Sequence, residues 1–424
     1  MGRDERGASR PDDWKPIWQT PQGELNAGAS MLGEEEVEEV LAVIRSHSLS
    51  RDYGPHCKEA VLRFEQEFAH RNGSAYALGT VSGTTALKIA LVAAGVGPGD
   101  EVIVPCCTFI ASAGAVVSAG AVPIFAEIDE SLSIDPDDIE SKITPRTRAI
   151  LAAHLYGLPC RIDPVVEIGK KHNLKVIENC ALSCGTEYKG RPIGSWGDLG
   201  AFSLQIVKVI TAGEGGVVTS SDPELYERAV RFHDGGNYRE NSRFPGITPH
   251  LDPFVGESYR MTELAGAVAL RQLEKLDAIT GTLRARYRRF REGIASIGGL
   301  TPQQVNDEAG HLGVRYGLLF DDAETCKRFS DATREEGLPM GLLYGGRPVY
   351  LLPQILNQAT VTPAASPWMS PLYEGEATYF EGLCARSEDT MKRVLQISRI
   401  NCLYSERDVD EIVSILGRVA KKVL

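Results

Sequence analysis

Lys208 is the residue whose type and setting most directly suggest covalent chemistry in this 424-residue chain. It lies in an apolar, strand-like run over residues 202–210 that gives way to Gly213-Glu214-Gly215-Gly216. A lysine amine attacks a carbonyl only when it is unprotonated, and apolar neighbours lower its pKa because they desolvate the charged form. Lys208 is therefore a candidate for Schiff-base formation, whereas a lone lysine of this kind is more often an edge-strand residue that extends its amine into water.

Two earlier segments offer ligands for a phosphate and for an aromatic ring. Ser82-Gly83-Thr84-Thr85 joins a strand at residues 75–81 to an apolar helix that starts at Ala86. Backbone N–H groups, hydroxyls and the positive end of a helix dipole coincide there, which favours an anion, although an ordinary N-cap has the same pattern. A buried strand at residues 102–105 places Phe109 at the carboxyl edge of a sheet, where ligands bind, although a phenylalanine taken alone at this position is more often a core residue.

A third strand, residues 174–178, ends in Asn179-Cys180-Ala181-Leu182, and the Lys208 segment follows it. With these elements in this order, the chain from about Leu32 to its C-terminus resembles the DegT/DnrJ/EryC1/StrS family of pyridoxal-phosphate-dependent sugar aminotransferases. The segments that carry the resemblance are Ser82-Gly83-Thr84-Thr85-Ala86-Leu87, residues 99–105 (Gly-Asp-Glu-Val-Ile-Val-Pro), Thr108-Phe109, Phe202-Ser203 with Lys208, Gly213-Glu214-Gly215-Gly216, and Tyr259-Arg260-Met261-Thr262-Glu263. Each segment is weak alone, and the ordered set is specific.

The resemblance implies pyridoxal 5'-phosphate as the cofactor and assigns its contacts. The implied cofactor-binding residues are Gly83, Thr84, Phe109, Asn179, Ala181, Ser203, Gln205, Lys208 and Asn237. Lys208 would form the Schiff base and move the proton between the substrate and the cofactor. Gly83, Thr84 and Ser203 would hold the phosphate.

Three further roles follow from the resemblance. Phe109 and Ala181 would cover opposite faces of the cofactor ring, and Gln205 would add a polar contact. Asn237, at the end of Asp234-Gly235-Gly236-Asn237, would reach the phosphate of a neighbouring subunit. We therefore expect a homodimer with shared active sites.

The chain departs from the family at two positions beside the ring. Asn179 stands where the family has an aspartate that pairs with the pyridine nitrogen, and Leu182 stands where it has histidine or glutamine. The aspartate keeps the nitrogen protonated, so that the ring accepts electrons, and a neutral amide supplies no countercharge. Glu178 should not replace it, because neighbouring strand residues point to opposite faces of the sheet. Either these two residues change how strongly the cofactor ring accepts electrons, or an unidentified residue replaces the missing polar contacts.

Composition limits the other function classes. The net charge of -12 argues against nucleic-acid and anionic-membrane partners, whose phosphates such a surface repels. The nine cysteines have no paired zinc-like spacing, so we expect reduced thiols, no metal site and a cytoplasmic protein. The uncharged stretch at residues 102–126 could be mistaken for a membrane span, but its prolines and glycines favour strand, helix, strand. The first residues lack an apolar signal core.

Alternating strands and helices predict an α/β fold with a mainly parallel sheet covered by helices, followed by a smaller C-terminal α+β domain. The expected boundaries are an N-terminal arm at 1–31, a large cofactor-binding domain at 32–277 and a small domain at 278–424. The resemblance implies an aminotransferase that moves an amino group from glutamate or glutamine to a keto sugar, sugar acid or cyclitol, in secondary-metabolite or cell-surface sugar biosynthesis. The alternatives are an elimination or dehydration enzyme of the same fold, and a non-catalytic partner subunit.

Overall fold

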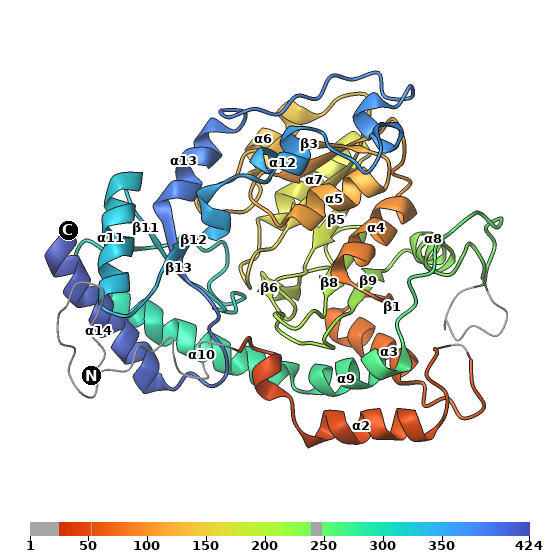
Figure 1. The fold of residues 1–424 in the computed structure, drawn as a ribbon, viewed down its shortest axis with the longest axis horizontal. Coiled ribbons are helices and arrows are strands. Elements are labelled where there is room, and N and C mark those ends of the chain that lie inside the picture. The colour runs from red at the N-terminus through yellow and green to blue at the C-terminus, as the bar shows by residue number, and fades with distance from the viewer. Residues whose placement is uncertain (1–24, 52, 239–247) are drawn as a thin grey trace.

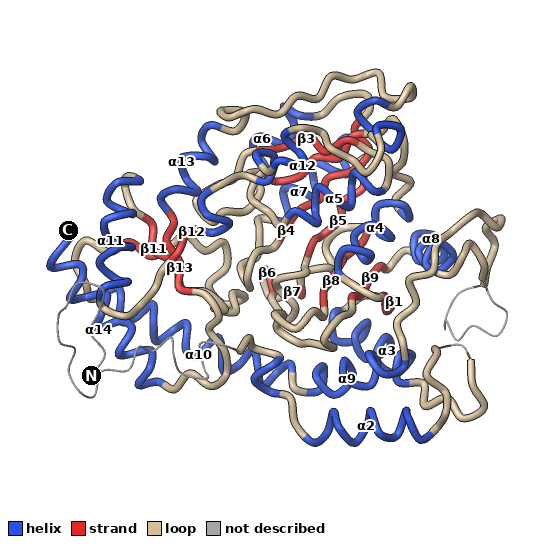
Figure 2. The backbone as a smooth tube through the Cα atoms, viewed as in Figure 1, coloured by secondary structure: helices blue, strands red, loops and turns tan. Residues whose placement is uncertain are grey.

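A seven-stranded sheet forms the centre of the molecule (Figures 1 and 2). The computed structural model describes residues 25–51, 53–238 and 248–424. The strand order is β1-β9-β8-β5-β4-β2-β3. The strands are β1 (Tyr76–Thr80), β2 (Glu101–Pro105), β3 (Val122–Ala126), β4 (Thr147–Ala153), β5 (Lys175–Asn179), β8 (Leu199–Ser203) and β9 (Gly216–Ser220). The neighbours from β3 to β8 pair in parallel, and β9 runs antiparallel to both β1 and β8.

The period of two along each strand divides the core into two layers, one on each face of the sheet. In β2, Ile103 belongs to one buried cluster, and Val102 and Val104 belong to the other. Val217 and Val218 of β9 divide in the same way. This double burial explains why the strands read as continuous apolar runs rather than as alternating ones.

Helices cover both faces of the sheet (Figure 2). Side chains of α4, α5 and α8 belong to one buried cluster, and those of α3, α7 and α9 belong to the other. The helices of this part are α2 (Glu34–Arg45), α3 (Ala60–Asn72), α4 (Gly83–Ala93), α5 (Ile110–Ser118), α6 (Pro136–Ile139), α7 (Ile162–His172), α8 (Pro223–His233) and α9 (Glu263–Glu274). A small hairpin, β6 (Glu187–Tyr188) and β7 (Arg191–Pro192), lies between β5 and β8 in sequence.

A second, four-stranded sheet of order β10-β11-β13-β12 lies beside the large one (Figure 1). The C-terminal part of the chain that contains this sheet consists of α10 (Leu276–Ala295), β10 (Thr301–Pro302), β11 (Tyr316–Leu319), α11 (Ala323–Glu335), β12 (Gly341–Leu342), α12 (Pro353–Leu356), α13 (Ala385–Arg393), β13 (Val394–Ile397) and α14 (Glu406–Val423). All its strand pairs are antiparallel, and α11 and α14 contact each other. The predicted fold class, a mainly parallel sheet with a smaller C-terminal α+β part, is confirmed.

One local prediction differs from the structure. The strand expected to carry Lys208 ends at Ser203, and Lys208 lies in the turn that follows. The apolar run in the sequence is longer than the strand, because Ile206 and Val207 are exposed and do not pack in the sheet. The uncharged stretch at residues 102–126 forms β2, α5 and β3 as expected.

The expectation of reduced cysteines agrees with the structure, in which all nine cysteines are free thiols. Among the described residues, no helix has the length and apolarity needed to cross a membrane. Most of the predicted N-terminal arm, residues 1–24, lies outside the described residues.

Candidate active site

The carboxyl ends of five strands of the large sheet open into one cavity of about 590 Å³. The structure brings eight of the nine predicted site residues to its wall: Gly83, Thr84, Phe109, Asn179, Ala181, Ser203, Gln205 and Lys208. The ninth, Asn237, is an exposed residue after α8 that does not line this cavity.

One end of the cavity is built to receive an anion. Ser82 caps α4 by accepting a hydrogen bond from the Thr85 N–H at 3.1 Å. The backbone N–H groups of Gly83 and Thr84 have no partner among the described residues, so they remain free at the positive end of the helix dipole. Ser203 packs so closely that a Cβ on residue 83 would lie 2.6 Å from the Ser203 Cβ. Glycine is therefore required for this cradle.

Phe109 and Ala181 also line the cavity. Phe109 precedes α5 and leaves 53% of its surface exposed, so it is not the core residue that its sequence context also allowed. Leu182 lies beside them as an apolar wall residue. A flat ring could be held here between apolar groups.

Asn179 is held rigidly at the end of β5. Its Oδ1 accepts a hydrogen bond from the Ala181 N–H at 3.0 Å, and its Nδ2 donates to the Ser112 hydroxyl at 2.9 Å. Ser112 in turn lies 2.7 Å from the Thr108 hydroxyl. One amide hydrogen of Asn179 remains for a ligand in the cavity.

Lys208 is positioned by backbone contacts of its turn. Its N–H donates to the Gln205 carbonyl at 2.9 Å, and its carbonyl accepts from the Gly28 N–H at 3.2 Å. Burial lowers the pKa of the Lys208 amine to about 8, while the nearby Glu214 carboxylate acts in the opposite direction. Among the described residues, its amine has no ion-pair partner. The amine is thus far closer to its reactive neutral form than an ordinary lysine.

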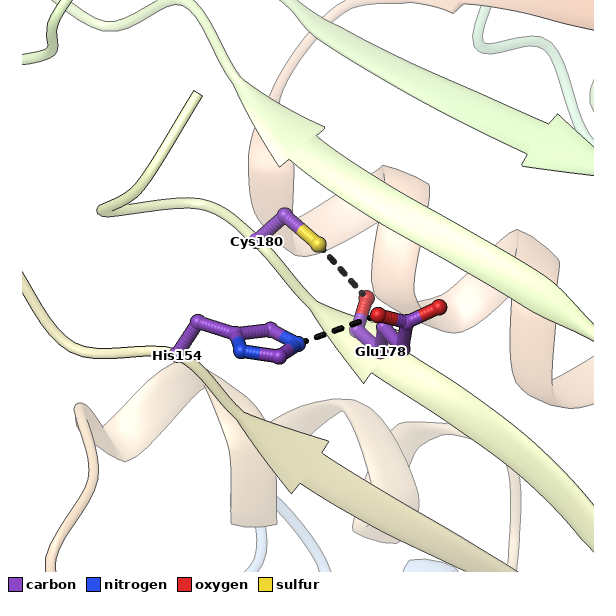
Figure 3. Close-up of side chains that lie close together, drawn as sticks. All are labelled: His154, Glu178 and Cys180. Atoms are coloured by element: carbon purple, nitrogen blue, oxygen red, sulfur yellow. Dashed lines mark hydrogen bonds and ion pairs between the residues drawn. The ribbon is translucent and has the colours of Figure 1, made fainter. Parts of the chain in front are cut away.

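The described residues contain one cluster with metal-like spacing, formed by His154, Glu178 and Cys180 (Figure 3). His154 Nδ1 accepts from the Cys160 N–H at 3.1 Å, which leaves the proton on Nε2, 3.1 Å from Glu178. Glu178 also accepts three backbone N–H groups, those of residues 194, 196 and 197. Burial raises the pKa of the Cys180 thiol, which disfavours the thiolate. These groups already satisfy one another and do not fit a divalent cation.

The cluster also settles the position of Glu178. Its carboxylate is bonded within the protein, whereas Asn179 lines the cavity. The expectation that Glu178 cannot take the place of Asn179 therefore agrees with the structure.

Sequence reasoning missed several cavity residues. His154 and Tyr156 follow β4, and the rule that ligands collect at carboxyl strand ends would have identified them. Arg315, Tyr344 and Arg399 come from the smaller sheet and its loops. No sequence signal joins these three to the large sheet, because their position depends on how the two parts pack.

Comparison with known proteins places the chain among aminotransferases. The DegT/DnrJ/EryC1/StrS aminotransferase family matches residues 30–374. GDP-perosamine synthase of Caulobacter vibrioides is 41% identical over 56% of this chain and 65% of its own length. The L-glutamine:2-deoxy-scyllo-inosose aminotransferase of Streptoalloteichus tenebrarius is 37% identical over 59% of each chain. This chain thus covers slightly less than two thirds of either relative.

The fold is also that of solved structures. DesV from S. venezuelae superposes with a TM-score of 0.77 at 29% identity, over 92% of this chain and 95% of DesV.

Proposed function

Since this chain belongs to the DegT/DnrJ/EryC1/StrS aminotransferase family, we propose that it moves an amino group from glutamate or glutamine to the keto group of a sugar, sugar acid or cyclitol. The single observation that carries this proposal is Lys208, a lysine of lowered pKa in a cavity that also contains an anion cradle. The names of the two relatives, one for a perosamine synthase and one for a scyllo-inosose aminotransferase, support this class of acceptor.

The family is pyridoxal-phosphate dependent, and the cavity fits that cofactor. The free N–H groups of Gly83 and Thr84 and the hydroxyl of Ser203 suit the phosphate. Phe109 and Ala181 suit the two faces of the ring. When bound, pyridoxal 5'-phosphate supplies an electron sink and a carrier for the amino group.

Lys208 would act first as a nucleophile and then as a base. Its neutral amine would hold the cofactor covalently between turnovers, until the incoming amino donor displaces it. The released amine, kept within the cavity, would then move the proton from the donor's α-carbon to the cofactor. A lysine pKa of about 8 suits both tasks near neutral pH.

The pKa of Lys208 predicts a pH profile. Covalent capture of pyridoxal 5'-phosphate by the apoprotein needs the neutral amine, so its rate should rise about tenfold per pH unit below the pKa and level off above about pH 8. Stopped-flow absorbance across pH 6–10 measures this rate. Glu214→Gln removes a carboxylate that raises the lysine pKa, so its plateau should begin at lower pH. A rate that still rises tenfold between pH 9 and pH 10 would exclude a depressed pKa.

We further propose a homodimer in which Asn237 reaches the phosphate of the partner's cavity. Its exposed position outside its own cavity supports this arrangement. Asn237→Ala should weaken cofactor retention about tenfold or more, as expected for one hydrogen bond to a charged group. Equilibrium dialysis with pyridoxal 5'-phosphate measures the change.

Mixed dimers provide the decisive control for shared sites. A heterodimer of Lys208→Ala and Asn237→Ala subunits contains one intact site if Asn237 acts across the interface. Tight cofactor retention should therefore return in about half of its sites. A mixture that gains no tight sites, or a fully active monomer, would rule out sharing.

The overall reaction is tested with labelled donors. The donors are ¹⁵N-glutamate and glutamine that carries ¹⁵N at its α-nitrogen only. Incubation of either donor with a panel of keto sugars and cyclitols should yield an acceptor that carries ¹⁵N, detected by mass spectrometry. A product that has lost water and gained no nitrogen would favour elimination, the alternative that Asn179 motivates. The retention of Lys208, Ser203 and the glycine turn at residues 213–216 in one cavity region speaks against a non-catalytic subunit.

A further inference from the structure

Two arginines line the cavity at one end of β11 and β13, the central strands of the smaller sheet. Tyr316 of β11 pairs with Ile397 of β13 in antiparallel register. One step further along this register, Arg315 stands opposite Ser398, and Arg399 follows. All three residues line the cavity that contains Lys208.

Arg315 is held in a fixed orientation. Its guanidinium carbon lies 3.5 Å from the centre of the Tyr156 ring, which is a close stacking contact. Its Nη1 donates to Gln396 Oε1 at 3.3 Å, and Gln396 donates onward to Gln303 at 2.7 Å. Arg315 is only partly exposed, and among the described residues no carboxylate lies within ion-pair distance of it. A partly buried, unpaired charge is costly, so an anion is the natural ligand.

The rest of this wall also favours an anionic ligand. The residues that line the cavity include one acid, Glu214, and three basic residues, Lys208, Arg315 and Arg399. The hydroxyl of Tyr344 is buried near Tyr156 but makes no well-formed hydrogen bond with the described residues.

The backbone of this wall is unusual. Tyr156, Tyr344 and Arg399 all have positive φ, at 52°, 52° and 64°. Non-glycine residues rarely adopt this region, and they do so most often at functional sites.

This wall is distinct from the phosphate cradle. Gly83 and Thr84 begin α4 and Ser203 ends β8 of the large sheet, whereas Arg315 precedes β11 and Arg399 follows β13 of the smaller sheet. The cavity therefore offers two separate anion subsites, and the cofactor phosphate accounts for only one of them.

We propose that Arg315, stacked on Tyr156 and oriented by Gln396, binds the α-carboxylate of the amino donor. This inference rests on the proposed function, because it assumes that an amino acid donates the nitrogen. The planar guanidinium presents paired N–H groups that match a carboxylate. The donor always carries this carboxylate, one bond from its reacting carbon, whereas a keto sugar or cyclitol need not carry any charge.

The donor half-reaction tests the proposal in three proteins: wild type, Arg315→Met and Arg315→Lys. The probes are glutamate, glutamine and glutaminol, in which a hydroxymethyl group replaces the α-carboxylate. For the preferred natural donor, Arg315→Met should raise the apparent Kd about tenfold to a hundredfold, with little change in the limiting rate. Its reaction with glutaminol should stay within about threefold of wild type, since the lost partner is already absent. The apparent donor Kd of Arg315→Lys should lie between those of wild type and Arg315→Met.

Arg407→Met is the matched control, because it removes an exposed arginine of α14 that does not line the cavity. Its donor Kd should change by less than about threefold, since exposed charges are screened. Cofactor retention should be unchanged in all variants.

Equal losses for glutaminol and the natural donor, or a donor Kd unaffected by both Arg315 substitutions, would overturn the assignment. A defect confined to the second half-reaction would also overturn it and would place an acidic group of the acceptor at Arg315. Wild-type protein that reacts with neither natural donor would instead refute the proposed function.

Discussion

Lys208→Ala is expected to lower amino transfer by at least about a thousandfold. The substitution removes both the group that holds the cofactor covalently and the base that moves the α-proton, and a positioned acid-base group alone contributes 10²–10⁴-fold. The reversible binding of pyridoxal 5'-phosphate through the cradle at Gly83, Thr84 and Ser203 should persist. Steady-state turnover and cofactor binding, measured on the same preparation, separate the two effects.

Borohydride reduction gives this prediction an independent readout. In wild type, reduction should fix the cofactor covalently to Lys208, and peptide mapping should find it on that residue alone. Val207→Ala alters the neighbouring cavity residue without removing the amine and serves as the control. A Lys208→Ala protein that keeps turnover, or an adduct mapped to another lysine, would refute the assignment of Lys208.

Asn179→Asp is expected to speed the donor half-reaction by roughly tenfold or more. A carboxylate at residue 179 would hold a proton on the pyridine nitrogen, and one charge-assisted hydrogen bond contributes about 1.5–3 kcal/mol, which is roughly tenfold to a few hundredfold in rate. The present partners can hold the new side chain, because the Ala181 N–H and the Ser112 hydroxyl can both donate to a carboxylate. Single-turnover spectra with glutamate or glutamine measure the rate.

The same variant distinguishes the two reaction types. If the neutral amide is suited to elimination, Asn179→Asp should lower native turnover while transamination rises as a side activity. Ser112→Ala is the matched control, since it removes a partner of Asn179 without adding charge, and it should not accelerate the half-reaction. Unchanged rates in both reactions would show that Asn179 does not face the pyridine nitrogen.

The large sheet and its site residues could be predicted from sequence because the information is local. Each predicted ligand that lines the cavity lies at the end of a short apolar strand or shortly after it, and parallel strands bring their carboxyl ends to one edge. Gly83 carries a local signal at a helix start, whereas Ser203 is assigned through the family resemblance. The same reasoning failed at residues 204–210, where apolar side chains suggested a longer strand, although Ile206 and Val207 are exposed.

The wall formed by the smaller sheet could not be predicted in this way. Arg315 precedes β11 and Arg399 follows β13, and neither has a local pattern that separates it from a surface arginine. The approach of Arg315 to Tyr156 is set by the packing of the two sheets and by the positive φ angle of Tyr156. Such long-range geometry leaves no periodic signal in the sequence.

The donor half-reaction without any acceptor tests amino transfer most directly. Protein saturated with pyridoxal 5'-phosphate is mixed with glutamate or glutamine, and the keto acid, ammonia and cofactor forms are quantified by chromatography. We expect one keto acid per bound cofactor, recovery of the cofactor as pyridoxamine 5'-phosphate, and no further turnover. Continued keto acid production with ammonia release, or no keto acid from either donor while the cofactor is bound at Lys208, would contradict amino transfer by this protein.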